Sequence, residues 1–231
     1  MAFDGITIAA IVRELHLNLD GGRFNKIAQP EADELLITGK GANGQCRLLL
    51  SASASLPLIY FTSKNKPSPM TAPNFCMLLR KHIGSARVSD IKQPGLERVV
   101  EFELEHLNEL GDPCKKVLIM GKHSNIIFCD DKNMILDSIK HVSSHMSSVR
   151  EVLPGREYFI PQTQDKLDPL TVSEELFREV VCRKPCNISK AIYSSLTGIS
   201  PVVAGLLWME VRLHRLWMRL HRCICIIHSA G

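Results

Sequence analysis

The clearest pattern in this chain is an alternation of apolar and acidic residues within residues 97–105. Val100, Phe102 and Leu104 alternate there with glutamates. Because successive side chains of a strand point to opposite faces, this predicts a strand with one buried face and one acidic, solvated face. Shorter apolar runs between Gly, Pro, Asn and Ser predict further strands at residues 23–28, 34–38, 46–51, 58–62, 87–92, 115–120, 125–129 and 134–136.

Helical spacing marks four other segments. Asp4 can cap a first helix whose apolar residues recur on one face until Gly21-Gly22 ends it, namely Ile8, Ile11, Val12 and Leu15. Asn74 can cap a helix at 75–83. Ser173 can cap another at 173–182, with Glu174 and Glu175 in its first turn. Residues 189–196 form the last predicted helix. The fold class is therefore α+β, with the strands gathered in residues 1–150.

The turn from Leu196 to Pro201 has two interpretations. An apolar residue, a turn glycine and a proline able to start a new helix match a helix–hairpin–helix signature, whose backbone N–H groups suit a phosphate. The alternative is an ordinary corner between two packed helices, and the pattern alone favours it.

The segment after Ala204 departs from the preceding pattern. It is abruptly rich in Arg, Leu, Trp, Cys and His, which is typical either of a basic amphipathic helix or of out-of-frame translation. We favour the second interpretation. It predicts that the turn at Gly198 lacks a proper second helix and that Trp208 and Trp217 are largely exposed. The predicted divisions are a β-rich domain at 1–155, a linker at 156–170, the start of a helical hairpin domain at 171–204 and an aberrant tail at 205–231.

Net charge says little about partners. The formal charge is +4, and residues 205–231 contribute +3 of it, which leaves about +1 for the rest. No charged segment precedes an apolar one at the start, and no apolar run approaches the ~20 residues that span a bilayer. We therefore expect a cytoplasmic protein without a membrane partner. Its eight cysteines should be reduced, and their spacing gives no zinc site, so no metal is expected.

The chain carries no enzyme motif. It has no glycine-rich phosphate loop, no His-Glu-x-x-His and no nucleophile elbow, so neither catalysis nor a cofactor is predicted. In the turn 121–125, Lys122, His123 and Ser124 are candidate RNA contacts. Alternatively, the side chains of Ser124 and Asn125 satisfy backbone groups of the turn. Arg98 is a candidate phosphate or base contact, or else a solvated arginine at a strand end.

Several blocks of the sequence, in order, resemble the N-terminal region of the NFACT family, the group that includes ribosome quality-control factors of the RqcH type. The resemblance covers residues 1–204. The blocks are Met1-Ala-Phe-Asp-Gly5, Lys26-Ile-Ala-Gln-Pro30, Pro73-Asn-Phe-Cys-Met-Leu-Leu-Arg-Lys81, Met120-Gly-Lys-His-Ser-Asn-Ile-Ile127, Ile135-Leu-Asp-Ser-Ile-Lys140 and Arg150-Glu-Val-Leu-Pro-Gly155.

The resemblance carries expectations about fold and function. It implies a sandwich-like domain similar to the first domain of formamidopyrimidine-DNA glycosylases, followed by a helical hairpin domain. It implies binding of stalled large ribosomal subunits, peptidyl-tRNA and alanyl-tRNA, with alanine tailing of nascent chains. The family's acidic residue in the first helix matches Asp4, and its Asp-Arg pair for tRNA matches Glu97-Arg98. We therefore expect Asp4 and Arg98 to lie close together on one exposed face.

Two alternatives of other classes remain. The family is also catalogued as fibronectin-binding protein A, which implies a surface adhesin; the absence of a signal peptide and a wall anchor from the sequence counts against it. A DNA-repair glycosylase would use an N-terminal proline amine as nucleophile, whereas this chain begins Met1-Ala2. No DNA partner is therefore expected.

Overall fold

The computed structural model describes residues 3–107, 113–121, 124–147, 151–160 and 166–209. The chain forms two compact units. One comprises residues 14–92 and 99–161. The other comprises residues 1–13, 93–98 and 162–231. We call them the sheet unit and the helical unit.

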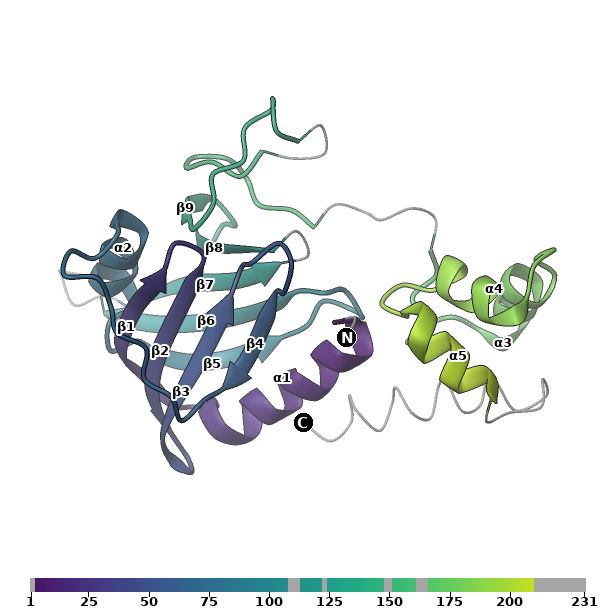
Figure 1. The fold of residues 1–231 in the computed structure, drawn as a ribbon, viewed down its shortest axis with the longest axis horizontal. Helices are drawn as coiled ribbons and strands as arrows, with labels where there is room; N and C mark the ends of the chain where they lie inside the picture. The colour runs from purple at the N-terminus through teal and green to yellow at the C-terminus, as the bar shows by residue number, and fades with distance from the viewer. Residues whose placement is uncertain (1–2, 108–112, 122–123, 148–150, 161–165, 210–231) are drawn as a thin grey trace. The chain divides into compact units, whose positions relative to one another are not determined.

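The sheet unit is built on one antiparallel sheet with the strand order β4-β3-β2-β1-β5-β6-β7-β8-β9 (Figure 1). Every neighbouring pair but one consists of strands consecutive in sequence. The exception is the short junction of β1 with β5, where Arg23 is in register with Arg87. The strands are β1 Arg23–Glu31, β2 Glu34–Gly41, β3 Gly44–Ser51, β4 Leu58–Phe61, β5 Arg87–Lys92, β6 Val100–Leu107, β7 Pro113–Gly121, β8 Asn125–Asp130 and β9 Ile135–Ser138.

The predicted α+β class and the strand-rich first part are confirmed. The strand expected to begin at residue 97 begins at Val100, because residues 93–98 leave the sheet and belong to the helical unit. Val100, Phe102 and Leu104 are buried as predicted. The alternating glutamates are half-buried rather than fully solvated. Burial raises the pKa of Glu101, and the negative charge of the neighbouring Glu103 raises it further.

One face of strands β1–β3 is the core face. Phe24, Ile27, Ile37 and Leu48 lie on it, all at most 2% exposed. Helix α1, Gly5–Leu19, packs its last turn here. A Cβ on Gly41 would lie only 1.7 Å from the carbonyl oxygen of Asn18, so only glycine permits this approach of α1 to β2.

Helix α2, Asn74–Ile83, lies against the sheet unit through buried Phe75, Leu79 and Ile83. The prediction that Asn74 caps this helix is wrong. The helix begins one residue earlier than predicted, so that Asn74 is its first helical residue and Pro73 occupies the cap position. No side chain caps the helix. Arg80 near the other end donates from Nε to the carbonyl of Ile27 at 2.7 Å and so ties α2 to β1.

The helical unit contains α3 Glu174–Phe177, the π-helix η1 Arg178–Cys182, α4 Ile188–Ser195 and α5 Pro201–Met209. The Ser173 hydroxyl accepts a hydrogen bond from the Leu176 N–H at 3.2 Å, which confirms Ser173 as a helix cap. These helices share a core that includes Phe177, Val181, Ile192 and Leu196.

Helix α5 bears on two predictions about the end of the chain. The prediction that the turn at Gly198 lacks a second helix is wrong, since α5 begins at Pro201 and buries Ala204 completely. Proline suits a first helical position, and the Ser200 hydroxyl accepts from the Val203 N–H at 3.2 Å. Trp208 is 38% exposed. Trp217 lies outside the described residues.

Within the described ranges, no helix is both long enough and apolar enough to cross a lipid bilayer.

Candidate nucleic-acid interface

The N-terminus of α1 carries a buried carboxylate. Asp4 caps the helix: its Oδ1 accepts hydrogen bonds from the backbone N–H of Thr7 at 2.9 Å and from the Thr7 hydroxyl at 3.0 Å. The residue is only 4% exposed, and its Oδ2 is buried without a hydrogen-bond partner among the described residues. The helix dipole favours a negative charge here, which offsets part of the cost of burying it.

Gln93 connects this helix end to the loop that carries Glu97 and Arg98. Its side-chain Nε2 donates to the carbonyl of Gly5 at 2.8 Å and to the carbonyl of Glu97 at 2.9 Å. One amide nitrogen thus holds the start of α1 beside Glu97. Sequence reasoning missed Gln93, and its position directly before the Pro94-Gly95 turn was the only available signal.

A third segment, the turn between α4 and α5, closes on the same place. The N–H of Gly5 donates to the carbonyl of Gly198 at 2.8 Å. A Cβ would lie 2.0 Å from the Leu96 carbonyl oxygen if built on Gly5, and 2.1 Å from it if built on Gly198. Three backbone segments distant in sequence therefore meet through two glycines, and Gly198 also has a φ of +73° that favours glycine.

Asp4, Glu97 and Arg98 are thus brought together within the helical unit. Glu97 is half-buried and Arg98 is exposed. Among the described residues, none forms a salt bridge with the Arg98 guanidinium. The expectation that Asp4 shares an exposed face with Arg98 is wrong for Asp4, because capping α1 takes its carboxylate into the interior.

The turn 121–125 belongs to the sheet unit instead. Lys122 and His123 lie outside the described residues. Ser124 has a φ of +51°, and its carbonyl accepts from Lys140 Nζ at 3.3 Å. The side chain of Asn125 donates to the Lys140 carbonyl at 2.8 Å and accepts from the Ile126 N–H at 2.9 Å. For Asn125 the structural interpretation of this turn is therefore the one observed.

The family profile described as NFACT N-terminal and middle domains matches residues 4–216. The chain belongs to the NFACT family. The match reaches beyond Ala204 and so includes the first part of the segment that departs from the pattern. It also includes Asp4, the residues 93–98 and the turn at Gly198, which together build the candidate site described above.

Two curated relatives illustrate the similarity. The Rqc2 homolog RqcH of Bacillus subtilis (strain 168) is 40% identical over 210 residues, which are 88% of this chain and 36% of that protein. The Rqc2 homolog RqcH of Streptococcus suis (strain 05ZYH33) is 33% identical over 220 residues, 94% of this chain and 40% of that protein. This NFACT chain therefore spans well under half the length of these relatives.

Solved structures show the same fold. The N-terminal part of the fibronectin/fibrinogen-binding protein from Streptococcus suis has a TM-score of 0.87 and 32% identity, covering 96% of this chain and 84% of that one. The N-terminal domain of the fibronectin-binding protein PavA from Streptococcus pneumoniae has a TM-score of 0.81 and 35% identity, covering 89% and 78%.

Proposed function

We propose that this chain is the RNA-binding N-terminal part of a translation-rescue factor. The factor binds stalled large ribosomal subunits together with peptidyl-tRNA, recruits alanyl-tRNA and promotes alanine tailing of the nascent chain. Support comes from membership of the NFACT family and from curated relatives that carry the name Rqc2 homolog RqcH. Asp4, Glu97 and Arg98 form the tRNA site in this proposal, and Lys122, His123 and Ser124 provide a further RNA contact.

One observation carries the site assignment. Arg98 is exposed and without a carboxylate partner among the described residues, yet the loop that bears it is fastened by Gln93 to the start of α1. An exposed guanidinium on a loop whose backbone is anchored suits a phosphate or a base edge. Asp4 acts as a positioning residue, since its buried carboxylate fixes the helix end against which this loop is held.

The turn between α4 and α5 belongs to the same proposal. We infer that α4, the turn at Gly198 and α5 are the first hairpin of a helical hairpin domain that begins near residue 171. The support is the spacing from Leu196 to Pro201 and the packing of both helices on one core.

The test is co-sedimentation of the tagged chain with large ribosomal subunits and tRNA from a bacterial lysate. Arg98→Ala should lower tRNA recovery several-fold, and it should reduce the dependence of log affinity on log salt by about one unit for one lost phosphate contact. Arg183→Ala is the matched control, an exposed arginine in the same unit. Equal recovery for both variants and the wild type would remove the assignment.

A fibronectin-binding role is the second candidate. The observation in its favour is that the two structural neighbours, at TM-scores of 0.87 and 0.81, are named fibronectin-binding proteins. Retention on immobilised fibronectin at a salt concentration that also abolishes tRNA recovery would favour it over the ribosomal role.

A further inference from the structure

The face of strands β1–β3 opposite the core face collects cations from separate strands. Register places Arg23, Lys40 and Gln45 in one row, because Arg23 pairs with Lys40 and Lys40 with Gln45. Lys26, Thr38 and Arg47 form the next row. A register shift between Phe24 and Lys26 lets Arg23 and Lys26 share this face. Arg87 extends the first row onto β5. We call Arg23, Lys26, Lys40, Arg47 and Arg87 the basic face.

This arrangement costs stability unless an anion is bound. Like charges directly opposite each other on adjacent strands repel, and Lys40, Arg23 and Arg87 stand in succession across three strands. Among the described residues no member of the basic face forms a salt bridge. The carboxylate opposite Arg87 is that of Glu105, and it lies 3.7 Å from Lys115 Nζ. Within the described part of the chain, none of these five cations is therefore ion-paired with a carboxylate.

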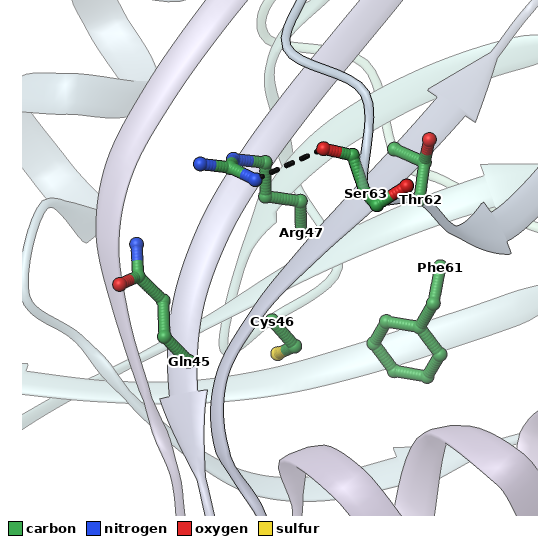
Figure 2. Close-up of a pocket in the computed structure, with 6 residues that line it drawn as sticks. All are labelled: Gln45, Cys46, Arg47, Phe61, Thr62 and Ser63. Atoms are coloured by element: carbon green, nitrogen blue, oxygen red, sulfur yellow. Dashed lines mark hydrogen bonds between the residues drawn. The ribbon is translucent and has the colours of Figure 1, made fainter.

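Two of the guanidinium groups are held in place by backbone. Arg23 Nη1 donates to the Ser85 carbonyl at 3.1 Å, and Arg47 Nη1 donates to the Ser63 carbonyl at 3.1 Å. Each uses one of five N–H donors, so the remaining donors stay available in a fixed orientation. Figure 2 shows Gln45 and Arg47 on one side of β3, with Cys46 and Phe61 on the other.

A hollow adjoins Arg47 at the end of β4. It has a volume of about 430 Å³ and is lined by Gln45, Cys46, Arg47, Phe61, Thr62 and Ser63 (Figure 2). Burial raises the pKa of the Cys46 thiol, so at neutral pH this sulfur is a poor nucleophile. The remaining polar groups are a guanidinium, an amide and hydroxyls. These are hydrogen-bond donors of the kind that contact phosphate and ribose oxygens.

We propose that the basic face binds the phosphate backbone of RNA. The row from Lys40 to Arg87 spans two strand spacings, about 10 Å, and the second row lies about 7 Å away along the strands. This area exceeds a single phosphate group and suits a repeating anion. Tyr60, paired with Leu49 in the row beyond Arg47 and 44% exposed, offers an aromatic surface beside the charges. The choice of RNA over another polyanion rests on the proposed ribosomal function.

The test compares variants of the full chain for binding to an RNA hairpin of about 16 base pairs across a salt series. The neutral variant combines Arg23→Gln, Lys40→Gln and Arg47→Gln. The control combines Lys115→Gln, Lys132→Gln and Arg156→Gln, which removes as much charge from exposed positions of the same unit. A third variant keeps the charge, with Arg23→Lys, Lys40→Arg and Arg47→Lys.

We expect the neutral variant to lose about tenfold or more in affinity at low salt and about two units of salt slope. The control and the charge-retaining variant should stay within about threefold of wild type. Equal losses in the neutral and control variants, or in the neutral and charge-retaining variants, would overturn the proposal. So would an unchanged RNA affinity with lost binding to phosphatidylserine vesicles, which would mark a membrane surface.

The outcome is separable from that of the proposed function. If the neutral variant binds RNA like wild type while Arg98→Ala loses tRNA, only the basic face is overturned. If the neutral variant loses RNA binding while the wild type never sediments with ribosomal subunits, the basic face stands and the proposed function falls.

Discussion

At the scale of single residues, the two carboxylate oxygens of Asp4 have different surroundings. Oδ1 caps α1 through Thr7, while Oδ2 is buried without a partner among the described residues. Sequence reasoning predicts the first, since Asp before an apolar helical pattern is a strong cap signal. It does not predict burial, because that depends on residues 93–98 and the turn at Gly198 closing around the helix end.

Substitution at Asp4 separates the cap from the charge. Asp4→Ala should lower the free energy of unfolding by about 0.5–2 kcal/mol through loss of the cap, whereas Asp4→Asn retains an equivalent acceptor and should change it little. Urea denaturation of the three proteins measures both values. An Asn variant as unstable as the Ala variant would show that the negative charge itself is required.

Glu101 gives a prediction about pH. Burial raises its pKa in the folded state, so the folded protein holds this proton more tightly than the unfolded chain. The favourable contribution is complete below the unfolded pKa and is lost as pH rises through the folded pKa. Glu101→Gln, which is never charged, should therefore raise the melting temperature at pH 7 and leave it nearly unchanged at pH 4. A variant less stable than wild type at pH 7 contradicts this.

At the scale of elements, the alternation and the short apolar runs predicted where the strands lie but not which strands pair. The strand predicted at residues 87–92 is observed with the same limits, and most others differ by one to three residues at an end. Alternation carries no information on pairing, so the junction of β1 with β5 and the register shift before Lys26 could not be foreseen. The basic face depends on both, which is why the sequence gives no sign of it.

Alanine substitution at two glycines can test how much the close backbone packing at the turn between α4 and α5 contributes to stability. Gly198→Ala forces a Cβ to 2.1 Å from the Leu96 carbonyl oxygen and strains a backbone with φ +73°. Gly155 has a φ of +80° with nothing within 4 Å of its Cβ position. Gly155→Ala should cost about 1–2 kcal/mol for the left-handed conformation alone. Gly198→Ala should cost about 3 kcal/mol or more.

Thermal melts monitored by circular dichroism compare the two alanine variants. Similar losses at both positions would mean that the approach of Gly198 to Leu96 is not needed for stability. In that case the Arg98 loop would be held mainly by Gln93.

At the scale of the whole molecule, α5 determines how far the chain can be shortened without loss of stability. Leu207, beyond Ala204, packs partly buried against the core of the helical unit. A chain ending at Ala204 should therefore be less stable than one ending at Met209, by about 1 kcal/mol for the lost apolar contact. We further predict that residues 210–231 add no stability, so that the chain ending at Met209 melts with the 231-residue chain. A melting temperature clearly higher for the longest chain would show that this tail is a genuine element.

The strand order has a consequence for how the protein forms. In two runs, β1 to β4 and β5 to β9, each strand pairs with the next one along the chain. The short β1–β5 junction joins the runs, with backbone hydrogen bonds such as that from the Phe24 N–H to the Ala86 carbonyl at 3.0 Å. Pairing between strands close in sequence closes short loops and is fast, whereas the β1–β5 junction must close the long segment between them. The strands of each run can thus pair locally. All residues of β1 to β4 are available for pairing once residue 61 has left the ribosome. The junction at Arg23 and Arg87 is then the late step, and it is also the step that completes the basic face.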